Sequence, residues 1–279
     1  MELKSSAKIN IGLHVHSIRS DGFHNISTLF QEISLYDSIK IDEAENFSCK
    51  TDCGNIPESD NFGTKAFRIV KKLKPELPNV SISIRKAIPM NAGLGGGSSN
   101  GTAVLKGLNR LFSLSLNKNK LSLIAKEISS DSTFFIEGGS QFGTQRGEKL
   151  QPVKNMEVPK HILLVHPNIK VSTKTAFEQL KNHLLNENMD INLSKLLREL
   201  KNNNFNSKLF KNDFEMYVFE THPEIGAIKL KLKDFGAEYA SLSGTGSTVF
   251  GIFPTEVAAQ KAEALFSPHY STYYVNPII

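Results

Sequence analysis

The chain has 279 residues, of which 39% are hydrophobic and 22% are charged, and its formal net charge at pH 7 is +5. This length predicts about two domains or one large one, and no apolar run of about 18 residues indicates a membrane span. The basic residues are scattered without a long cluster, which argues against nucleic acid as a partner and favours small anionic ligands. Residues 1–6 have the features of neither a signal peptide nor a transit peptide, so we expect a cytoplasmic location.

The first half of the chain predicts strands followed by an alternation of strands and helices. Residues 7–13 and 26–41 are typical of strands, with a break expected at 36–38, and residues 48–59 are typical of a loop or of the end of a hairpin. Apolar side chains at helical spacing predict helices over 62–73 and 121–128, and strict alternation predicts a strand over 80–84. Cys49 and Cys53 are expected to be free thiols, and His14 and His16 to be ordinary strand histidines, because neither pair completes a metal site.

The second half begins after a polar segment bounded by prolines, residues 152–159, which predicts a boundary between a domain of residues 1–153 and one of residues 154–279. Residues 161–166 are typical of a buried strand, and the Asn- and Lys-rich segment 182–212 of a surface helix with loose flanks. Two strands pinched at 243–246 are expected within 239–253, and a final helix over 256–266.

The most informative segment is residues 89–100, in which four glycines precede a helix expected to start near Ser98. Glycines let backbone N–H groups approach an anion closely, and a helix N-terminus adds partial positive charge. Ser98 and Ser99 can cap that helix or offer hydroxyls to a phosphate or its metal ion. The segment therefore predicts a phosphate-binding loop.

Other glycine-rich loops match this segment poorly. A Walker loop needs a lysine directly after the last glycine, but the first lysine after Gly97 is Lys106. A dinucleotide fingerprint needs an acidic residue about 20 residues on, but none occurs between Gly97 and Glu127. A protein-kinase glycine loop joins two strands, whereas this loop opens a helix.

The loop resembles the second motif of the GHMP small-molecule kinases, the superfamily of galactokinase, homoserine kinase and mevalonate kinase. Residues 7–13 resemble its first motif and residues 242–250 its third. Residues 21–24, 95–100, 146–150 and 212–215 resemble the branch that phosphorylates 4-diphosphocytidyl-2-C-methyl-D-erythritol. Two alternatives stay open: another small-molecule kinase of the superfamily, of the homoserine or mevalonate type, and a non-catalytic nucleotide-binding relative.

The resemblance implies an α+β fold with a ribosomal-S5-like N-terminal domain, a ferredoxin-like C-terminal domain and an active site between them. It also implies ATP as phosphoryl donor, Mg²⁺ as its companion, a cytidyl small-molecule substrate, and a monomer or weak homodimer. Mg²⁺ bridges and neutralises ATP phosphates. No motif carboxylate is an obvious Mg²⁺ ligand, which leaves Ser98 or Ser99 as candidates.

Phosphoryl transfer to a hydroxyl needs a group that manages the hydroxyl proton and a cation that eases the development of negative charge. The resemblance assigns these roles to Asp131 and Lys8. One departure concerns the turn that carries Asp131: the family usually has Gly-Ala-Asp-Val-Pro, where this chain has Ser129-Ser130-Asp131-Ser132-Thr133. Gly101 and Thr102 likewise stand where the family favours two alanines.

The resemblance also implies the binding residues. Phe23 and Phe177 are expected to flank the cytosine ring and His24 to read its edge, with Asn10 near the methylerythritol end and Gly244 in the turn of the third motif. The residues expected to bind the nucleotide are Pro89, Asn91, Ala92, Gly93, Leu94, Gly95, Gly96, Gly97, Ser98 and Ser99.

Overall fold

The computed structural model describes residues 1–53, 56–153, 160–180, 193–202 and 208–279. The chain divides into two compact units, each assembled from separate segments. Unit 1 comprises Met1–Ala7, Leu35–Met90 and Gly95–Gly138, and unit 2 comprises Lys8–Ser34, Asn91–Leu94 and Gly139–Ile279. The predicted domain boundary at 153/154 adjoins residues 154–159, which lie outside the described residues, so it stays a prediction.

Two long strands, β1 (Glu2–Ile18) and β2 (His24–Glu43), pair with each other and supply residues to both units. In unit 1, β2 pairs antiparallel with β4 (Val80–Arg85), and β4 pairs in parallel with β3 (Ser48–Thr51). Alternate side chains of these strands, such as Ile39, Ile41 and Ile82, are buried, as the pleat of a half-covered sheet requires.

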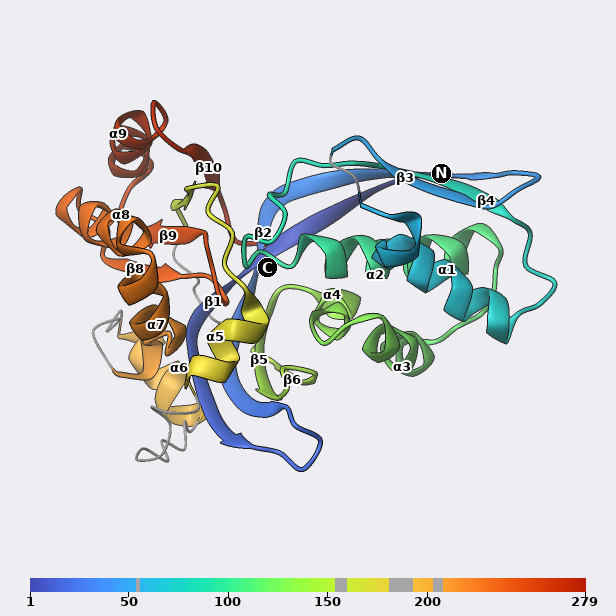
Figure 1. Ribbon diagram of the computed structural model, residues 1–279, viewed down its shortest axis with the longest axis horizontal. Coiled ribbons are helices and arrows are strands. Elements are labelled where there is room, and N and C mark those ends of the chain that lie inside the picture. The colour runs from blue at the N-terminus through green and yellow to red at the C-terminus, as the bar shows by residue number, and fades with distance from the viewer. Residues whose placement is uncertain (54–55, 154–159, 181–192, 203–207) are drawn as a thin grey trace. The chain divides into compact units, whose positions relative to one another are not determined.

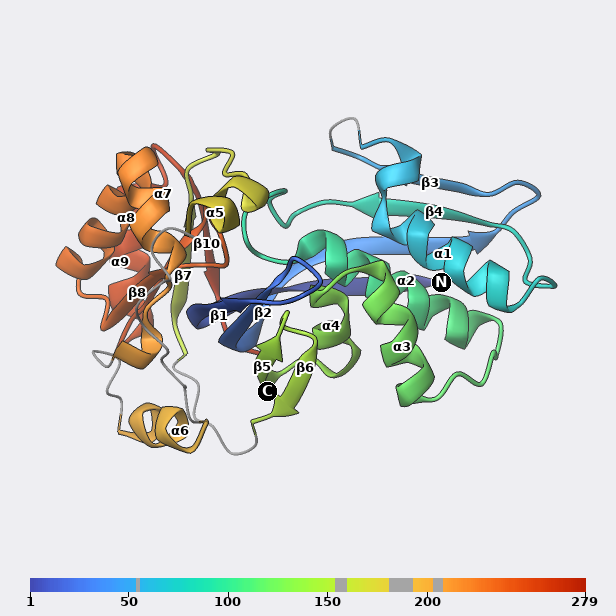
Figure 2. The same cartoon turned by 60° about the horizontal axis from the view of Figure 1, so that its bottom comes forward.

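Helices α1 (Phe62–Leu73), α2 (Gly96–Leu111) and α3 (Lys118–Ile128) bury their apolar faces against these strand residues in one core (Figures 1 and 2). The short elements of this unit are η1 (Glu58–Asp60), η2 (Asp131–Thr133) and α4 (Phe134–Glu137). The predicted helix over 62–73 and strand over 80–84 are confirmed. The helix after the glycine loop begins at Gly96, two residues before its predicted start.

The predicted break in the second strand at residues 36–38 is wrong, because β2 runs through them without interruption. Asp37 is fully buried there, and its carboxylate accepts hydrogen bonds from the backbone N–H groups of Ala87 and Ile88, each at 2.8 Å. The side chain of Asn100 donates to the same carboxylate at 2.8 Å, and Lys86 forms an ion pair with it. These partners allow an acidic residue to stay inside a strand.

The sequence predicts a loop or the end of a hairpin at residues 48–51, but they form β3, which pairs in parallel with β4. Cys49 lies on the buried face of this strand, and its side chain packs in the core formed by the unit 1 strands and helices. Both cysteines are free thiols, as predicted.

Unit 2 contains a four-stranded antiparallel sheet whose strands are, in spatial order, β10 (Ser271–Val275), β7 (Ile162–His166), β9 (Val249–Ile252) and β8 (Tyr239–Leu242). Helices α8 (Pro223–Asp234) and α9 (Glu256–Phe266) pack on this sheet, and their apolar side chains form one core with those of the strands. Its helices are α5 (Thr173–Leu180), α6 (Leu193–Lys201), η4 (Lys208–Phe210), α7 (Phe214–Thr221), α8 (Pro223–Asp234) and α9 (Glu256–Phe266). Two further strands of this unit, β5 (Ser140–Gln145) and β6 (Lys149–Pro152), belong to the sheet of β2. Strand β5 pairs antiparallel with β2, and β6 pairs antiparallel with β5.

The strand order of this sheet, with helices between its first and second and its third and fourth strands in sequence, is that of a ferredoxin-like fold. The predicted α+β fold class is therefore confirmed, as are the strand near 161–166, the strand pair within 239–253 and the final helix. Within the segment 182–212, α6 is a helix as predicted, while its flanks at 181–192 and 203–207 lie outside the described residues. Among the helices that the structure describes, none is long and apolar enough to cross a membrane.

Candidate functional site

Lys8 is the second residue of the first motif, on β1, and it is only 4% exposed. Its Nζ donates hydrogen bonds to Asn10 Oδ1 at 2.7 Å and to the carbonyl oxygen of Gly93 at 3.0 Å. Asn10 lies two residues on, so the strand pleat places it on the same face as Lys8. The Asn10 amide in turn donates to Thr28 Oγ1 at 3.0 Å. These contacts fix both side chains in one orientation.

The first part of the glycine loop, residues 91–94, lies against β1 and against the turn of the third motif. The backbone N–H of Lys8 donates to the carbonyl oxygen of Leu94 at 3.0 Å, and the Ser243 hydroxyl donates to that of Gly93 at 3.0 Å. Gly93 has φ +77°, and a Cβ added there would lie 1.9 Å from the Ser243 carbonyl oxygen. Only glycine fits this contact. Parts of all three motifs therefore meet in unit 2.

Residues 212–215 hold the third motif in place. The Asn212 side chain donates to the carbonyl oxygens of Leu242 and Gly244, both at 2.8 Å. The carboxylate of Glu215 accepts from the backbone N–H of Leu242 at 3.0 Å. The sequence marks these residues only through the resemblance, because no local pattern shows that they brace a turn about 30 residues away.

His166 of β7 lies beneath the same turn. Its Nδ1 is 3.4 Å from Ser247 Oγ and 3.3 Å from Thr248 Oγ1. Burial lowers the pKa of His166, so the imidazole is neutral at physiological pH. A neutral ring next to two hydroxyls adds no positive charge beneath the third motif.

The second part of the glycine loop opens α2 in unit 1. Gly95, at φ +69°, is the N-cap residue and Gly96 the first residue of the helix, so of the two roles open to Ser98 and Ser99 neither serine takes that of helix cap. Ser98 and Ser99 are buried in the first turn instead. Ser98 Oγ accepts a hydrogen bond from the hydroxyl of Ser129 at 2.8 Å. The 16-residue helix retains the partial positive N-terminus that suits a phosphate.

Asp131 opens η2, three residues after the last residue of α3, and is half-buried. It belongs to unit 1, whereas Lys8 belongs to unit 2. The predicted pairing of these two residues therefore stays a prediction.

The residues expected to hold the cytosine ring fall into two contacts within unit 2. The Phe177 ring stacks on His24 with a centroid distance of 5.3 Å and an interplanar angle of 23°. Phe23 is 51% exposed, and the guanidinium carbon of Arg146 lies over its ring, 4.2 Å from the ring centroid. Sequence reasoning gave Arg146 no role, although residues 146–150 carry part of the resemblance.

The turn before Phe23 is held by its own charges. Arg19 donates from Nε to both carboxylate oxygens of Asp21, at 3.1 and 3.2 Å, and this hydrogen bonding lowers the pKa of Asp21. Asp21 Oδ1 also accepts from the backbone N–H of Phe23 at 3.2 Å. These hydrogen bonds hold the backbone of the turn, and so fix the position of the backbone that carries the exposed Phe23 ring.

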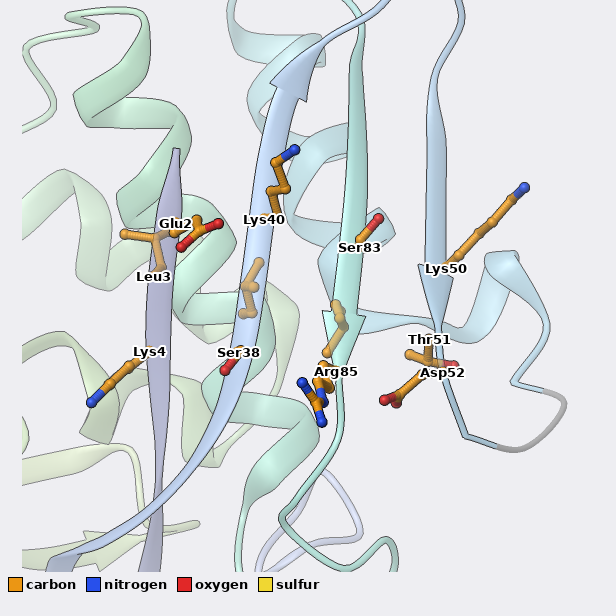
Figure 3. Close-up of a pocket in the computed structure, with 12 residues that line it drawn as sticks. Glu2, Leu3, Lys4, Ser38, Lys40, Lys50, Thr51, Asp52, Ser83 and Arg85 are labelled. Atoms are coloured by element: carbon orange, nitrogen blue, oxygen red, sulfur yellow. The ribbon is translucent and has the colours of Figure 1, made fainter.

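A hollow of about 780 Å³ lies elsewhere, on the solvent-facing side of the unit 1 strands (Figure 3). Glu2, Lys4, Lys40, Lys50, Asp52 and Arg85 are among the residues that line it. Its lysine side chains point in different directions in Figure 3, and none of the predicted site residues lines it. It is the polar side of an amphipathic sheet, and we place the candidate site at the three motifs instead.

Comparison with known proteins gives the family. The GHMP kinases N terminal domain model matches residues 61–139 and the GHMP kinases C terminal model matches residues 178–270. A 4-diphosphocytidyl-2-C-methyl-D-erythritol kinase of Parabacteroides distasonis is 37% identical, with 94% of each chain covered.

Solved structures show the same fold. A crystal structure of 4-(cytidine 5'-diphospho)-2C-methyl-D-erythritol kinase has a TM-score of 0.85 at 24% identity and covers 99% of both chains. A mevalonate kinase structure is less similar, with a TM-score of 0.71 at 14% identity and 99% of both chains covered. Given the 37% identity over nearly its whole length and both domain matches, this chain belongs to the 4-diphosphocytidyl-2-C-methyl-D-erythritol kinase family of GHMP kinases.

Proposed function

We propose that this chain transfers the γ-phosphoryl group of ATP to the 2-hydroxyl of 4-diphosphocytidyl-2-C-methyl-D-erythritol, a step of the non-mevalonate route to isoprenoid precursors. The observation that carries the proposal is the meeting of Lys8 and Asn10 with Gly93 and the turn at Ser243 and Gly244. This arrangement sits in a chain whose relatives bear the name of that kinase. Within the proposal, ATP is the donor and a cytidyl alcohol the acceptor.

The glycine loop holds the ATP phosphates in this proposal. Backbone N–H groups at the start of α2 provide donors, and the helix dipole favours negative charge there. Gly97 is exposed at this end, so the phosphates can approach the backbone closely. The ten residues predicted from Pro89 to Ser99 form the nucleotide side of the proposed site.

Asp131 accepts or orients the proton of the attacking hydroxyl, and Lys8 stabilises the negative charge that develops on the oxygen. A positioned general base contributes about 10²–10⁴ in rate. Lys8 is held by Asn10 Oδ1 and the Gly93 carbonyl oxygen, so its ammonium is oriented before the substrate binds. This preorganisation avoids reordering the cation during the reaction.

The cytosine ring is recognised by aromatic side chains of unit 2. The Phe177–His24 stack and the exposed Phe23 ring provide faces on which a planar base stacks, and His24 provides an edge for hydrogen bonding. Arg146 orients the Phe23 ring through its contact at 4.2 Å. These residues select a cytidyl alcohol over homoserine or mevalonate.

Mg²⁺ accompanies ATP in the proposed reaction and neutralises charge on the phosphates when bound. In the part of the chain that the structure describes, no group of three or more His, Cys, Asp or Glu side chains could hold a metal ion. Within the proposal, Ser98 or Ser99 would offer the ion one protein hydroxyl.

The test is ADP release by the purified chain with Mg-ATP and each of three alcohols: 4-diphosphocytidyl-2-C-methyl-D-erythritol, homoserine and mevalonate. We expect turnover with the cytidyl substrate only. Turnover with another alcohol would overturn the cytosine site, and ATP binding without turnover would favour a non-catalytic nucleotide-binding protein. Asp131→Asn should lower kcat by about 10²–10⁴, and Lys8→Met should also impair turnover. Lys40→Met and Asp42→Asn, which alter an exposed ion pair on β2, serve as matched controls and should leave kcat unchanged.

A further inference from the structure

Four hydroxyl side chains connect the turn that carries Asp131 to the first turns of α2. We call them the hydroxyl cluster: Ser98, Thr102, Ser129 and Ser132. All four belong to unit 1. The Ser129 hydroxyl donates to Ser98 Oγ at 2.8 Å and lies 2.6 Å from Ser132 Oγ.

The backbone takes part in the same connections. The Thr102 hydroxyl contacts two carbonyl oxygens, that of Ser98 at 3.0 Å and that of Ser132 at 2.8 Å. The Ser132 hydroxyl donates to the Ser98 carbonyl oxygen at 3.2 Å, and the Ser132 backbone N–H to Ser129 Oγ at 3.2 Å. The cluster therefore fixes main-chain atoms on both sides.

Because the cluster is largely buried, its hydrogen bonds hold the turn at residues 129–132 in a fixed position against the start of α2. Ser132 is fully buried and Thr102 is 1% exposed, so water cannot replace a lost partner without a structural change. Asp131 lies between Ser129 and Ser132, and both of these residues are held to α2. The position of the Asp131 backbone is thereby tied to Ser98, in the loop that holds the phosphates in the proposed function.

The cluster also includes residues that depart from the expected family motifs. Ser129, Ser132 and Thr102 stand at positions where the resemblance leads one to expect Gly, Val and Ala. Each of the three hydroxyls makes a hydrogen bond within the cluster. Side-chain hydrogen bonds here hold a turn that lacks the expected glycine and proline.

We propose that the hydroxyl cluster positions Asp131 relative to the phosphate-binding end of α2, with Thr102 and Ser132 as positioning residues. The inference rests on the proposed function, in which Asp131 handles the substrate proton. A displacement of about 1 Å in such a group can lower the rate about 100-fold.

The test compares Thr102→Val and Ser132→Ala with Thr64→Val, which changes a fully buried threonine of α1 outside the cluster. Steady-state ADP release should show kcat about 10–100-fold lower for the two cluster variants, with KM for both substrates within about twofold of wild type. Thr64→Val should retain kcat. Thr102→Ser, which keeps the hydroxyl, should restore it. Thermal unfolding of each variant establishes that the assayed protein is folded.

A double-mutant cycle separates positioning from general damage. If Ser132 acts through Asp131, Ser132→Ala should cause little further loss of kcat in an Asp131→Asn background. An undiminished loss in that background, or unchanged kcat in folded Thr102→Val and Ser132→Ala proteins, would overturn the positioning role. Wild-type kcat in Asp131→Asn alone would instead refute the proton-handling role in the proposed function.

Discussion

Substituting Gly93 with alanine tests the contact between the glycine loop and the third motif. The new Cβ would lie 1.9 Å from the Ser243 carbonyl oxygen, 2.9 Å from its carbonyl carbon and 3.2 Å from the Gly246 carbonyl oxygen. All three of these neighbours are backbone atoms, so no side chain can rotate away to make room. One of the two loops has to move.

The size of the movement follows from the distances. Cβ atoms are essentially never found closer than 3.0 Å to such an atom, so the Cβ and the Ser243 oxygen must separate by at least 1.1 Å. The Gly93 carbonyl oxygen, which accepts from Lys8 Nζ and the Ser243 hydroxyl, moves with the loop. A shift of about 1 Å in a catalytic arrangement lowers the rate about 100-fold. The positive φ of +77° adds about 1–2 kcal/mol of backbone strain.

The assay is kcat/KM for ADP release with the cytidyl substrate, and Gly236→Ala is the matched control. Gly236 has φ +94°, but no atom lies within 4 Å of its added Cβ. Both variants therefore carry strain from positive φ, while only Gly93→Ala carries the clash. We expect kcat/KM to fall about 100-fold in Gly93→Ala and to stay near wild type in Gly236→Ala. If folded Gly93→Ala protein came within about threefold of the control, the reasoning would be refuted.

Three further predictions concern buried titratable groups. Burial lowers the pKa of His166, so below about pH 6.5 the unfolded chain binds more protons than the folded one, and the unfolding free energy should decrease as the pH falls. Urea unfolding of the His166→Gln variant should show a weaker pH dependence than that of the wild type. Burial raises the pKa of both cysteine thiols, but Cys49 is only 4% exposed whereas Cys53 is half-buried, so a small alkylating reagent should reach and label Cys53 first. Mass spectrometry should show that this difference disappears in urea. The Asp37→Ala variant leaves the buried Lys86 without its carboxylate partner and should lower the unfolding free energy by about 3–5 kcal/mol in urea titrations. The control Asp42→Ala, which removes an exposed carboxylate, should change the unfolding free energy by less than about 0.5 kcal/mol.

Local patterns predicted the elements next to the glycine loop well. Alternation of apolar residues identified β4, and helical spacing identified α1 and the body of α2. The same patterns failed at Asp37, because the groups that satisfy its carboxylate lie 49 or more residues away along the chain. A charged residue with distant partners has the local signature of a strand break.

The arrangement of the candidate site could not be derived from spacing either. Gly93 and Ser243 are 150 residues apart, and a hydrogen bond joins them. The resemblance identified both segments, but the contact that requires glycine became visible only in three dimensions. The bracing role of Asn212 is of the same kind, since both carbonyl oxygens that it binds belong to residues about 30 positions later.

The passage of β1 through both units has a consequence for how the protein can be divided. Leu13 pairs with Asn212, and the backbone N–H of Val15 donates to the Asp213 carboxylate at 2.8 Å. A fragment of residues 154–279 alone would lack these strand partners and the 91–94 segment. We expect such a fragment to fold poorly by itself but to recover structure when a fragment of residues 1–153 is supplied in trans. The two halves of this chain would then be fragments that complement each other and not two domains that fold independently.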